Sequence, residues 1–558
     1  MSNGRHWEKS YPAQLRGYQL SADTLAGSVA DLARHSSERY ADQPAFTLVL
    51  PSGLQADLSF TQIDHLSDAF AAYLVQERGL EPGAVLAVQL PNSLHYPIAV
   101  LGAWKAGLIV TNVNPLYTER ELDAQLADSG AQLLVACDLF AARAAPIAEA
   151  RGVGLILTRL SDFFPEAVGQ VIQQKLAEQA GHSLLPEQPF QLFEEALALG
   201  RQLPAMPSRR HPVALYQYTG GTTGRSKGAE LTHSNLLSVL RMAEDYVQAF
   251  GAKIEAGDVI VTIPPLYHIF AFVFNFLLFL RNGGRNLLIA NPRPLANAFP
   301  AFDKFPVRWM TGVDTLYAGL LNEPWLQANP PKLKLAVSGG TALRPSTAAR
   351  WQESVGPILE GYGLTESSCF VAFNPPGGGA RAGTVGLPLP GCDVRIAAAD
   401  GSQLPVGEPG ELLVRGPHIM ARYLNRPEET REAFVDGWFR TGDIAVMEAD
   451  GFIRIVDRKK DMVLVSGFNV YPNEVEEVIA EHPDVSEVAV IGVPDANTGE
   501  ALCAFVALHR PGLDGEAIIH HCRARLTAYK VPRRIEFREQ LPKSPIGKIL
   551  RAQLRSEG

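Results

Sequence analysis

The sequence lacks the features that mark secreted, membrane-spanning and disulfide-built proteins. Its 558 residues include only five cysteines, and no two of them form a C-x-x-C pair, which predicts reduced thiols and neither a zinc site nor a disulfide framework. No apolar run reaches the roughly 18 residues of a membrane span, and the most apolar stretch, residues 269–280, contains Asn275. The polar N-terminus has no signal-peptide core. These absences predict a cytoplasmic globular protein.

An excess of positive charge is missing as well. The net charge is −9 at pH 7 and the isoelectric point is near 5.9, which argues against a dedicated nucleic-acid binder. Residues 521–558 depart from this balance, because they hold ten Lys and Arg against three Glu. This terminal segment is either a solvated basic face or a cap that closes over phosphates.

The rest of the composition is ordinary globular material, with 46% apolar residues and enough length for a large core. Short apolar runs alternate with helical patterns, and one helix is predicted to have Thr61 as its N-cap and to end at Gly79. Near-continuous apolar strands separated by helices predict parallel sheets that are covered on both faces. The predicted strands span residues 84–90, 132–136, 154–158, 259–263, 286–290 and 333–337.

The pattern changes near residue 380. Residues 385–415 are rich in Gly and Pro, which predicts a β-rich subdomain over about 380–457. A compact α+β unit follows. Its predicted helices span 474–480 and 516–526, and its predicted strands span 485–491 and 501–508. The fold class predicted from these patterns is α/β, with a large N-terminal part and a small C-terminal part.

The strongest chemical signal is the segment Tyr218 to Gly228, which reads YTGGTTGRSKG. Its glycines let the backbone approach a ligand closely, and its threonine hydroxyls, amides and lysine suit a polyphosphate. It is not a Walker A loop, because that pattern places Ser or Thr directly after the lysine, whereas Gly228 follows Lys227 here. A plain glycine-rich turn is the alternative, although it would not need three threonines and a lysine.

This segment resembles the phosphate loop of the adenylate-forming superfamily, which includes acyl-CoA synthetases, peptide-synthetase adenylation domains and firefly luciferases. Other motifs of that superfamily follow in order, and residues 436–443 with 455–458 resemble the fatty acyl-CoA synthetase signature. The motifs are PPLYH at 264–268, GYGLTE at 361–366, TGD at 441–443, DRKKD at 457–461 and PKSPIGK at 542–548. The resemblance implies stacked α/β subdomains and the β-rich subdomain in residues 1–459, and a mobile lid in residues 460–558 with its hinge near Lys460.

The resemblance also implies a nucleotide site. Tyr362 would stack on adenine, with core packing as the alternative, and the carboxylate of Asp443 would bind the ribose hydroxyls, with Arg458 as the second contact. The implied nucleotide-binding residues are Tyr218, Thr219, Gly220, Gly221, Thr222, Thr223, Gly224, Lys227, Gly339, Gly340, Gly361, Tyr362, Gly363, Thr365, Asp443 and Arg458. Glu366 would bind Mg²⁺ with Thr219 nearby, because a hard carboxylate oxygen suits this ion.

Three catalytic residues follow from the same resemblance: Lys548, Glu366 and His268. Lys548 would bring positive charge to the attacking carboxylate and the bridging oxygen, where charge develops as a phosphoryl group is transferred. His268 is favoured as a positioning or gating group over a general base.

The remaining implied roles concern the acyl chain and the second step. An acyl tunnel would be lined by Phe272, Phe276, Gly312 and Val313, with simple core packing as the alternative for the phenylalanines. A second face of the lid, around Ser466, Gly467 and Phe468, would serve thioester formation with CoA.

The resemblance therefore implies a fatty acyl-CoA synthetase that uses ATP, Mg²⁺ and CoA and prefers a long-chain acid. The alternatives are a medium-chain or aryl-CoA ligase, a fatty acyl-AMP ligase or adenylation domain, and a non-catalytic acyl or nucleotide sensor. The expected partners are the fatty acid, ATP and CoA, with no nucleic acid. A lipid substrate is compatible with peripheral contact at the inner face of a membrane, although no amphipathic anchor stands out, and the sequence leaves a homo-oligomer open.

Overall fold

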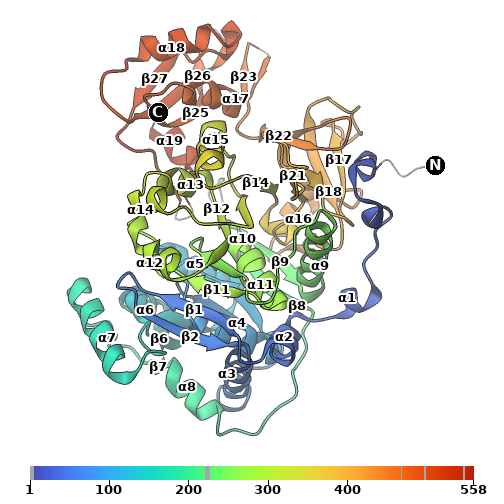
Figure 1. The fold of residues 1–558 in the computed structure, drawn as a ribbon. Coiled ribbons are helices and arrows are strands. Elements are labelled where there is room, and N and C mark those ends of the chain that lie inside the picture. The colour runs from blue at the N-terminus through green and yellow to red at the C-terminus, as the bar shows by residue number, and fades with distance from the viewer. Residues whose placement is uncertain (1–4, 220–225, 467, 496–497, 545–546, 558) are drawn as a thin grey trace.

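The computed structural model describes residues 5–219, 226–466, 468–495, 498–544 and 547–557. Two large sheets form the body of the molecule, and a small sheet and a C-terminal α+β unit lie against it (Figure 1). This arrangement confirms the predicted α/β fold class.

The first large sheet has eight strands in the order β19-β9-β8-β4-β3-β5-β6-β7. The strands from β8 to β7 are parallel, whereas β9 and β19 run antiparallel at one edge. The strands are β3 (Val85–Gln89), β4 (Ile109–Asn112), β5 (Ala131–Cys137), β6 (Gly154–Thr158), β7 (Gln191–Leu192), β8 (Val213–Tyr218), β9 (Gly228–Thr232) and β19 (Arg422–Tyr423). The three apolar runs predicted in residues 84–158 are strands of this sheet.

The second large sheet has nine strands in the order β16-β15-β14-β13-β12-β10-β11-β1-β2. Its six central strands, from β14 to β1, are parallel. The strands are β1 (Pro44–Val49), β2 (Gln55–Ser59), β10 (Val259–Thr262), β11 (Arg285–Leu288), β12 (Val307–Gly312), β13 (Leu335–Ser338), β14 (Ile358–Tyr362), β15 (Ala372–Phe373) and β16 (Leu387–Pro388). The other three predicted strands are β10, β11 and β13.

The two large sheets share one apolar core, and other helices cover their outer faces. The shared core is completed by helices α2 (Leu32–Tyr40), α3 (Phe60–Ala72), α4 (His95–Lys105) and α9 (His233–Ala249). The outer faces carry α5 (Glu119–Ser129) and α6 (Ala141–Ala150) on the first sheet, and α12 (Phe299–Lys304), α13 (Asp314–Leu320), α14 (Pro324–Ala328) and α15 (Pro345–Ser354) on the second. Both parallel sheets are therefore covered on both faces, as predicted.

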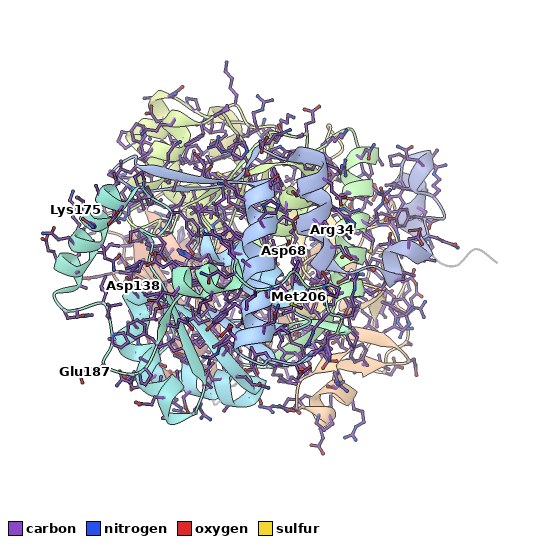
Figure 2. The ribbon with its side chains drawn as sticks, turned by 90° about the horizontal axis from the view of Figure 1, so that it is seen from below. Arg34, Asp68, Asp138, Lys175, Glu187 and Met206 are labelled. Atoms are coloured by element: carbon purple, nitrogen blue, oxygen red, sulfur yellow. The ribbon has the colours of Figure 1, made fainter. Side chains whose placement is uncertain are left out.

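Some of the remaining α-helices of the body are peripheral, and others pack into the core that the two large sheets share. The remaining helices are α1 (Ala22–Ala26), α7 (Glu166–Ala180), α8 (Phe193–Gly200), α10 (Ile269–Ala271), α11 (Phe279–Asn282) and α16 (Pro427–Ala433), of which α10 and α11 flank a buried π-helical turn, Phe272–Leu278. Figure 2 shows Lys175 of α7 at the rim of the molecule and Asp68 of α3 near the centre of the view.

The start of α3 corrects one prediction. The N-cap is Ser59 rather than Thr61: the Ser59 hydroxyl accepts the Gln62 N–H at 3.2 Å, and the Ser59 N–H donates to the Gln62 side-chain oxygen at 2.8 Å. This capping box satisfies two backbone groups at once. The helical course ends before Gly79, whose φ is +63°.

The small sheet follows β16 and forms the order β17-β18-β21-β20, with β22 paired to β21. Its strands are β17 (Asp393–Ala397), β18 (Gly410–Arg415), β20 (Phe434–Val435), β21 (Trp438–Met447) and β22 (Ile453–Arg458). The C-terminal unit has the sheet order β24-β23-β26-β25, with β27 on β26. Its elements are β23 (Val463–Val465), β24 (Phe468–Val470), α17 (Pro472–Ala480), β25 (Val485–Asp495), β26 (Gly499–Leu508), α18 (Gly515–Arg523), β27 (Arg534–Phe537) and α19 (Arg551–Glu557).

The arrangement brings together strand ends that are far apart in the sequence. Ligands of open α/β sheets bind outside the carboxyl ends of the strands. The carboxyl ends of β4 and β8 in the first sheet and of β13 and β14 in the second sheet meet at one cavity. The C-terminal unit lies above α13 and α15 in Figure 1 and contributes to the same cavity.

Candidate active site

A cavity of about 1710 Å³ lies between the large sheets, the small sheet and the C-terminal unit. The predicted nucleotide-binding residues on its wall are Tyr218, Thr219, Lys227, Gly339, Gly340, Gly361, Tyr362, Gly363, Thr365 and Arg458. Gly220, Gly221, Thr222, Thr223 and Gly224 lie outside the described residues. Side chains from four parts of the chain thus converge on one space that is large enough for a nucleotide and an acid.

The two ends of the phosphate loop are joined by hydrogen bonds. The Thr219 N–H donates to the Lys227 carbonyl at 2.9 Å, and the Ser226 hydroxyl donates to the Thr219 carbonyl. The ammonium of Lys227 lies 5.2 Å from the centre of the Tyr423 ring, a cation–π contact. Because β8 and β9 pair on either side of the loop, its ends are fixed at the cavity wall.

Glu366 forms a buried carboxylate on the same wall. It follows β14 in a short turn, and its Oε1 accepts the Tyr423 hydroxyl at 2.6 Å. Burial raises the pKa of Glu366 above its ordinary value, while the hydrogen bond from Tyr423 acts in the opposite direction. One carboxylate beside the predicted phosphate loop fits the donor set that Mg²⁺ takes when phosphates and water complete its shell.

Tyr362 and Arg458 line the cavity, and Asp443 is buried behind them. The Tyr362 hydroxyl donates to Asp443 Oδ2 at 2.5 Å, and the guanidinium of Arg458 lies 2.7 Å from Asp443 Oδ1. Tyr362 ends β14, whereas Asp443 and Arg458 face each other across β21 and β22. Asp443 and Arg458, the predicted ribose-binding pair, therefore contact each other, and Tyr362 is hydrogen-bonded to Asp443.

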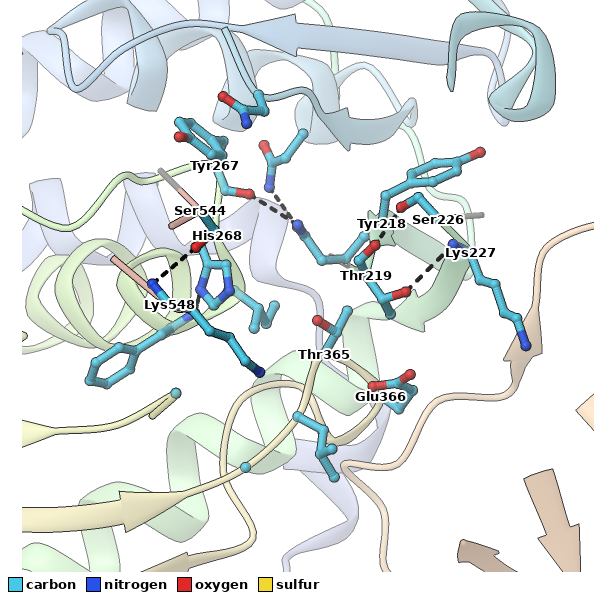
Figure 3. Close-up of a pocket in the computed structure, with 18 of the residues that line it drawn as sticks. Tyr218, Thr219, Ser226, Lys227, Tyr267, His268, Thr365, Glu366, Ser544 and Lys548 are labelled. Atoms are coloured by element: carbon cyan, nitrogen blue, oxygen red, sulfur yellow. Dashed lines mark hydrogen bonds between the residues drawn. The ribbon is translucent and has the colours of Figure 1, made fainter. Parts of the chain in front are cut away.

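Lys548 enters the cavity from the C-terminal unit. Its backbone N–H donates to the Ser544 hydroxyl at 3.1 Å, and its carbonyl accepts the Ser544 N–H at 2.7 Å. Burial, with the nearby charge of Arg458 as the next cause, lowers the pKa of Lys548 to about 8. In Figure 3 its side chain runs beside His268, and Glu366 is seen between Lys548 and Lys227.

His268 is the N-cap of the helical segment that follows it. Its Nδ1 accepts the Phe270 N–H at 3.4 Å. Burial and then the charge of Lys548 lower the pKa of His268 to about 4. The imidazole is therefore neutral near pH 7, and its Nδ1 is occupied as an acceptor.

The predicted hinge residue, Lys460, lies on the cavity wall between two anchored neighbours. Lys459 on one side pairs with Glu411 of β18 at 3.0 Å. Asp461 on the other side pairs with Arg555 of α19 at 2.6 Å. The chain is thus attached to the small sheet just before residue 460 and to the C-terminal unit just after it.

The residues predicted to serve CoA lie away from the cavity in this arrangement. Ser466 and Phe468 are exposed and are not on its wall, and Gly467 lies outside the described residues. Phe468 is 56% exposed and stacks on Tyr529 with ring centres 4.7 Å apart.

The predicted acyl-tunnel residues are not on the wall of this cavity either. Phe272 and Phe276 are fully buried in the π-helical turn and pack edge-to-face on each other at 5.6 Å and on Tyr96. Gly312 and Val313 lie at the end of β12, outside the wall. Aromatic residues that do reach the cavity include Tyr267 and Phe270 next to His268, Phe370, and Tyr423 against Glu366.

Two residues of the site carry no motif and escaped sequence reasoning. Tyr423, on the short strand β19, contacts both Glu366 and Lys227. Asp128, at the end of α5, accepts the Tyr218 hydroxyl at 2.8 Å and pairs with Arg426 at 3.1 Å. Tyr423 reaches the site because β19 pairs with β9, and Asp128 reaches it because the end of α5 contacts Tyr218 and Arg426. A single sequence reveals neither arrangement.

Comparison with known proteins decides the family. The sequence profile of the AMP-binding enzyme family matches residues 33–424, and that of its C-terminal domain matches residues 474–548. The protein belongs to the AMP-binding enzyme family. A long-chain-fatty-acid–CoA ligase of Salmonella typhimurium is 44% identical to this AMP-binding enzyme over 560 residues, which cover 99% of this chain and 98% of the relative.

Solved structures agree with this assignment. The ATP-bound structure of MatB from Rhodopseudomonas palustris is 28% identical and has a TM-score of 0.81, with 95% of this AMP-binding enzyme and 98% of that chain covered. The apo structure of the same protein, at the same identity and coverage, has a TM-score of 0.71. The arrangement described here is thus more similar to the ATP-bound form.

The described part of this AMP-binding enzyme offers neither a membrane-spanning helix nor a ready-made metal cluster. Within the ranges that the structure describes, no helix has the length and apolarity to cross a bilayer. Over the same part of the chain, His, Cys, Asp and Glu form no cluster of three or more that could hold a metal ion. A metal bound by Glu366 would therefore take other ligands as well, as Mg²⁺ does from phosphates and water.

Proposed function

We propose that this protein is a long-chain fatty acyl-CoA synthetase. It joins a fatty acid to the AMP part of ATP with release of pyrophosphate, and it then passes the acyl group to the thiol of CoA with release of AMP. The observation that carries the proposal is one cavity shared by the ends of the phosphate loop, the Glu366 carboxylate and the Lys548 ammonium. The 44% identity to a long-chain-fatty-acid–CoA ligase over nearly the whole chain supports the substrate class.

The first step needs positive charge around the phosphate oxygens, because an anion attacks a triphosphate. Lys227 and Lys548 supply this charge from different sides of the cavity (Figure 3). His268 is neutral and adds none, so its role is to position the carboxylate beside Lys548. Glu366 would hold Mg²⁺ with the Thr219 hydroxyl nearby, and the bound ion would add further positive charge to the phosphates.

The second step would use a different arrangement of the C-terminal unit, because the face around Ser466 and Phe468 is outside the cavity here. Lys460 is the proposed pivot, since the residues on either side of it are attached to different bodies. A few residues that change φ and ψ are enough for such a rotation. The higher TM-score with the ATP-bound neighbour supports the present arrangement as the one for the first step.

A smaller acid is the second candidate. Phe272 and Phe276 are fully buried in the core, and the aromatic residues that line the cavity next to His268 in the sequence are Tyr267 and Phe270. A long chain would require the rings of the π-helical turn to move apart, whereas a medium-chain or aromatic acid would not.

The two candidates differ in how activity depends on the acid. We expect AMP release in the presence of CoA to rise with chain length and to be highest for a long-chain fatty acid, since each buried methylene adds about 0.8 kcal/mol to binding. AMP release would be measured across saturated acids of graded length together with benzoate. Maximal rates with benzoate or with medium-chain or shorter acids would reject the long-chain assignment, and no AMP release with any acid would reject the activity.

The pH dependence of the first step tests the state of Lys548. A lysine whose pKa is about 8 is charged below pH 8 and neutral above it, so kcat/KM for acyl-AMP formation should fall as the pH rises through about 8. His268, with a pKa of about 4, should contribute no change between pH 5.5 and 7.5. Pyrophosphate release without CoA measures this profile. In Lys548→Arg the alkaline fall should disappear, because a guanidinium stays charged; an unchanged fall in that variant would contradict the assignment.

Contact with a membrane and self-association remain predictions. Flotation with anionic vesicles would test membrane contact, and sedimentation would test self-association.

A further inference from the structure

Arg344 connects the loop that follows β13 to the C-terminal unit. Its backbone N–H donates to Asp314 Oδ1 at 3.0 Å, and its Nε donates to Asp314 Oδ2 at 2.6 Å. Its Nη1 donates to the carbonyl of Ser486, in β25, at 2.9 Å. One guanidinium therefore bridges the large body and the C-terminal unit.

The bridge is held in a fixed direction. Asp314 is buried at the start of α13 and accepts both the backbone and the side chain of Arg344. A guanidinium is planar, so the carboxylate that binds Nε also sets where Nη1 points. The acceptor on the other side is a main-chain carbonyl at the start of a strand, so the contact specifies a position of the whole C-terminal unit.

A second contact lies beside the first. The hydroxyl of Thr315, the neighbour of Asp314, is 3.4 Å from the carbonyl of Gly547. Gly547 directly precedes Lys548, its φ is +84°, and a Cβ at this position would fall 2.3 Å from the Thr315 hydroxyl. The C-terminal unit therefore approaches α13 closely at the residue next to Lys548.

We propose that Arg344 is a positioning residue for acyl-AMP formation. It holds the C-terminal unit where Lys548 reaches the cavity, and it acts through that unit without touching the substrates. The loop that Arg344 ends also carries Gly339 and Gly340 of the cavity wall, so the same residue ties this wall to the unit above it. The inference rests on the proposed two-step function, because only the first step needs Lys548 in the cavity.

The test separates the two half-reactions. Acyl-AMP formation is followed as pyrophosphate release without CoA, and thioester formation is followed from preformed acyl-AMP and CoA. Arg344→Met keeps the apolar stem and removes the charged hydrogen bond, and it should slow the first half-reaction about 10-fold, as loss of a charged hydrogen bond does. The second half-reaction should be unchanged or faster, because the arrangement that excludes Ser466 and Phe468 from the cavity is weakened.

Three other variants complete the design. Arg344→Lys keeps the charge and should restore part of the first half-reaction. Thr315→Val removes the neighbouring contact without changing the volume, and it should slow the first half-reaction by a smaller factor, which keeps the test valid if Arg344→Met does not fold. Arg350→Met is the matched control: Arg350 lies on α15, bonds only Asn322 in the described contacts and should leave both half-reactions at the wild-type rate.

Each outcome has a defined meaning. Equal losses in both half-reactions, or no loss in either, would overturn the positioning role of Arg344. A wild-type protein that forms no acyl-AMP from any fatty acid would instead overturn the proposed function. A loss confined to acyl-AMP formation, with partial recovery in Arg344→Lys, would support the inference.

Discussion

Replacing Lys548 with alanine should slow acyl-AMP formation by a factor of about 10²–10³, which corresponds to roughly 2.7–4 kcal/mol of lost transition-state stabilisation. Lys548 is half-buried on the cavity wall and lies beside His268, which is neutral and cannot replace its charge (Figure 3). Lys227 remains in the variant, but it approaches from the other side of Glu366. The measurement is pyrophosphate release in the absence of CoA.

The same variant should leave thioester formation nearly intact. Starting from preformed acyl-AMP, the second step breaks the bond between the acyl group and AMP and needs no charge on a triphosphate. Lys530→Ala is the matched control, because Lys530 belongs to the same unit, pairs with Glu474 at 2.6 Å and is not on the cavity wall. Wild-type adenylation by Lys548→Ala, or equal losses in both steps, would refute the role of Lys548.

The parts of this site that were predictable from the sequence are those with local patterns. The phosphate-loop ends, Glu366 and Lys548 each lie in a glycine-bearing motif, and all of them reach one cavity. Six strands of the two large sheets (β3, β5, β6, β10, β11 and β13) were predictable for the same reason, because an apolar run such as β6 needs no tertiary information to be recognised. These motifs are far apart in the sequence, and they meet at one cavity because the fold brings the ends of their strands together.

The parts that were not predictable depend on pairing between distant segments. Tyr423 has no motif around it, and it reaches Glu366 because β19 pairs with β9 across about 190 residues of sequence. Arg344 contacts Ser486 only because the C-terminal unit lies over α13. Phe272 and Phe276 show a second limit. An aromatic run beside His268 has the same composition whether it lines a tunnel or fills a core, and in this arrangement both rings are fully buried. The acyl tunnel stays a prediction.

Gly363→Ala should be the most destabilising single methyl group that can be added near the site. Gly363 follows β14, and the chain then turns back through Ser368 and Cys369, whose φ angles are +53° and +107°. A Cβ on Gly363 would lie 1.5 Å from the Cys369 carbonyl oxygen and 2.9 Å from the Phe370 Cα. Because these are main-chain atoms, no side-chain rotation relieves the overlap, and the turn that carries Glu366 has to open.

Changes of this kind belong to the tail of mutational effects, at about 3 kcal/mol or more. With an unfolding entropy of about 2.1 cal/mol/K per residue, each 1 kcal/mol lowers the melting temperature of a body of roughly 450 residues by about 1 °C. We therefore expect an apparent melting temperature about 3 °C or more below wild type, or loss of soluble protein. Gly339→Ala is the control on the same cavity wall, since its Cβ would meet its nearest atoms, in Phe270 and Gly361, at 3.4–3.5 Å, an ordinary contact distance. If Gly363→Ala has the melting temperature of the wild type while that of Gly339→Ala is lower, the turn between β14 and Glu366 does not have the close backbone packing described here.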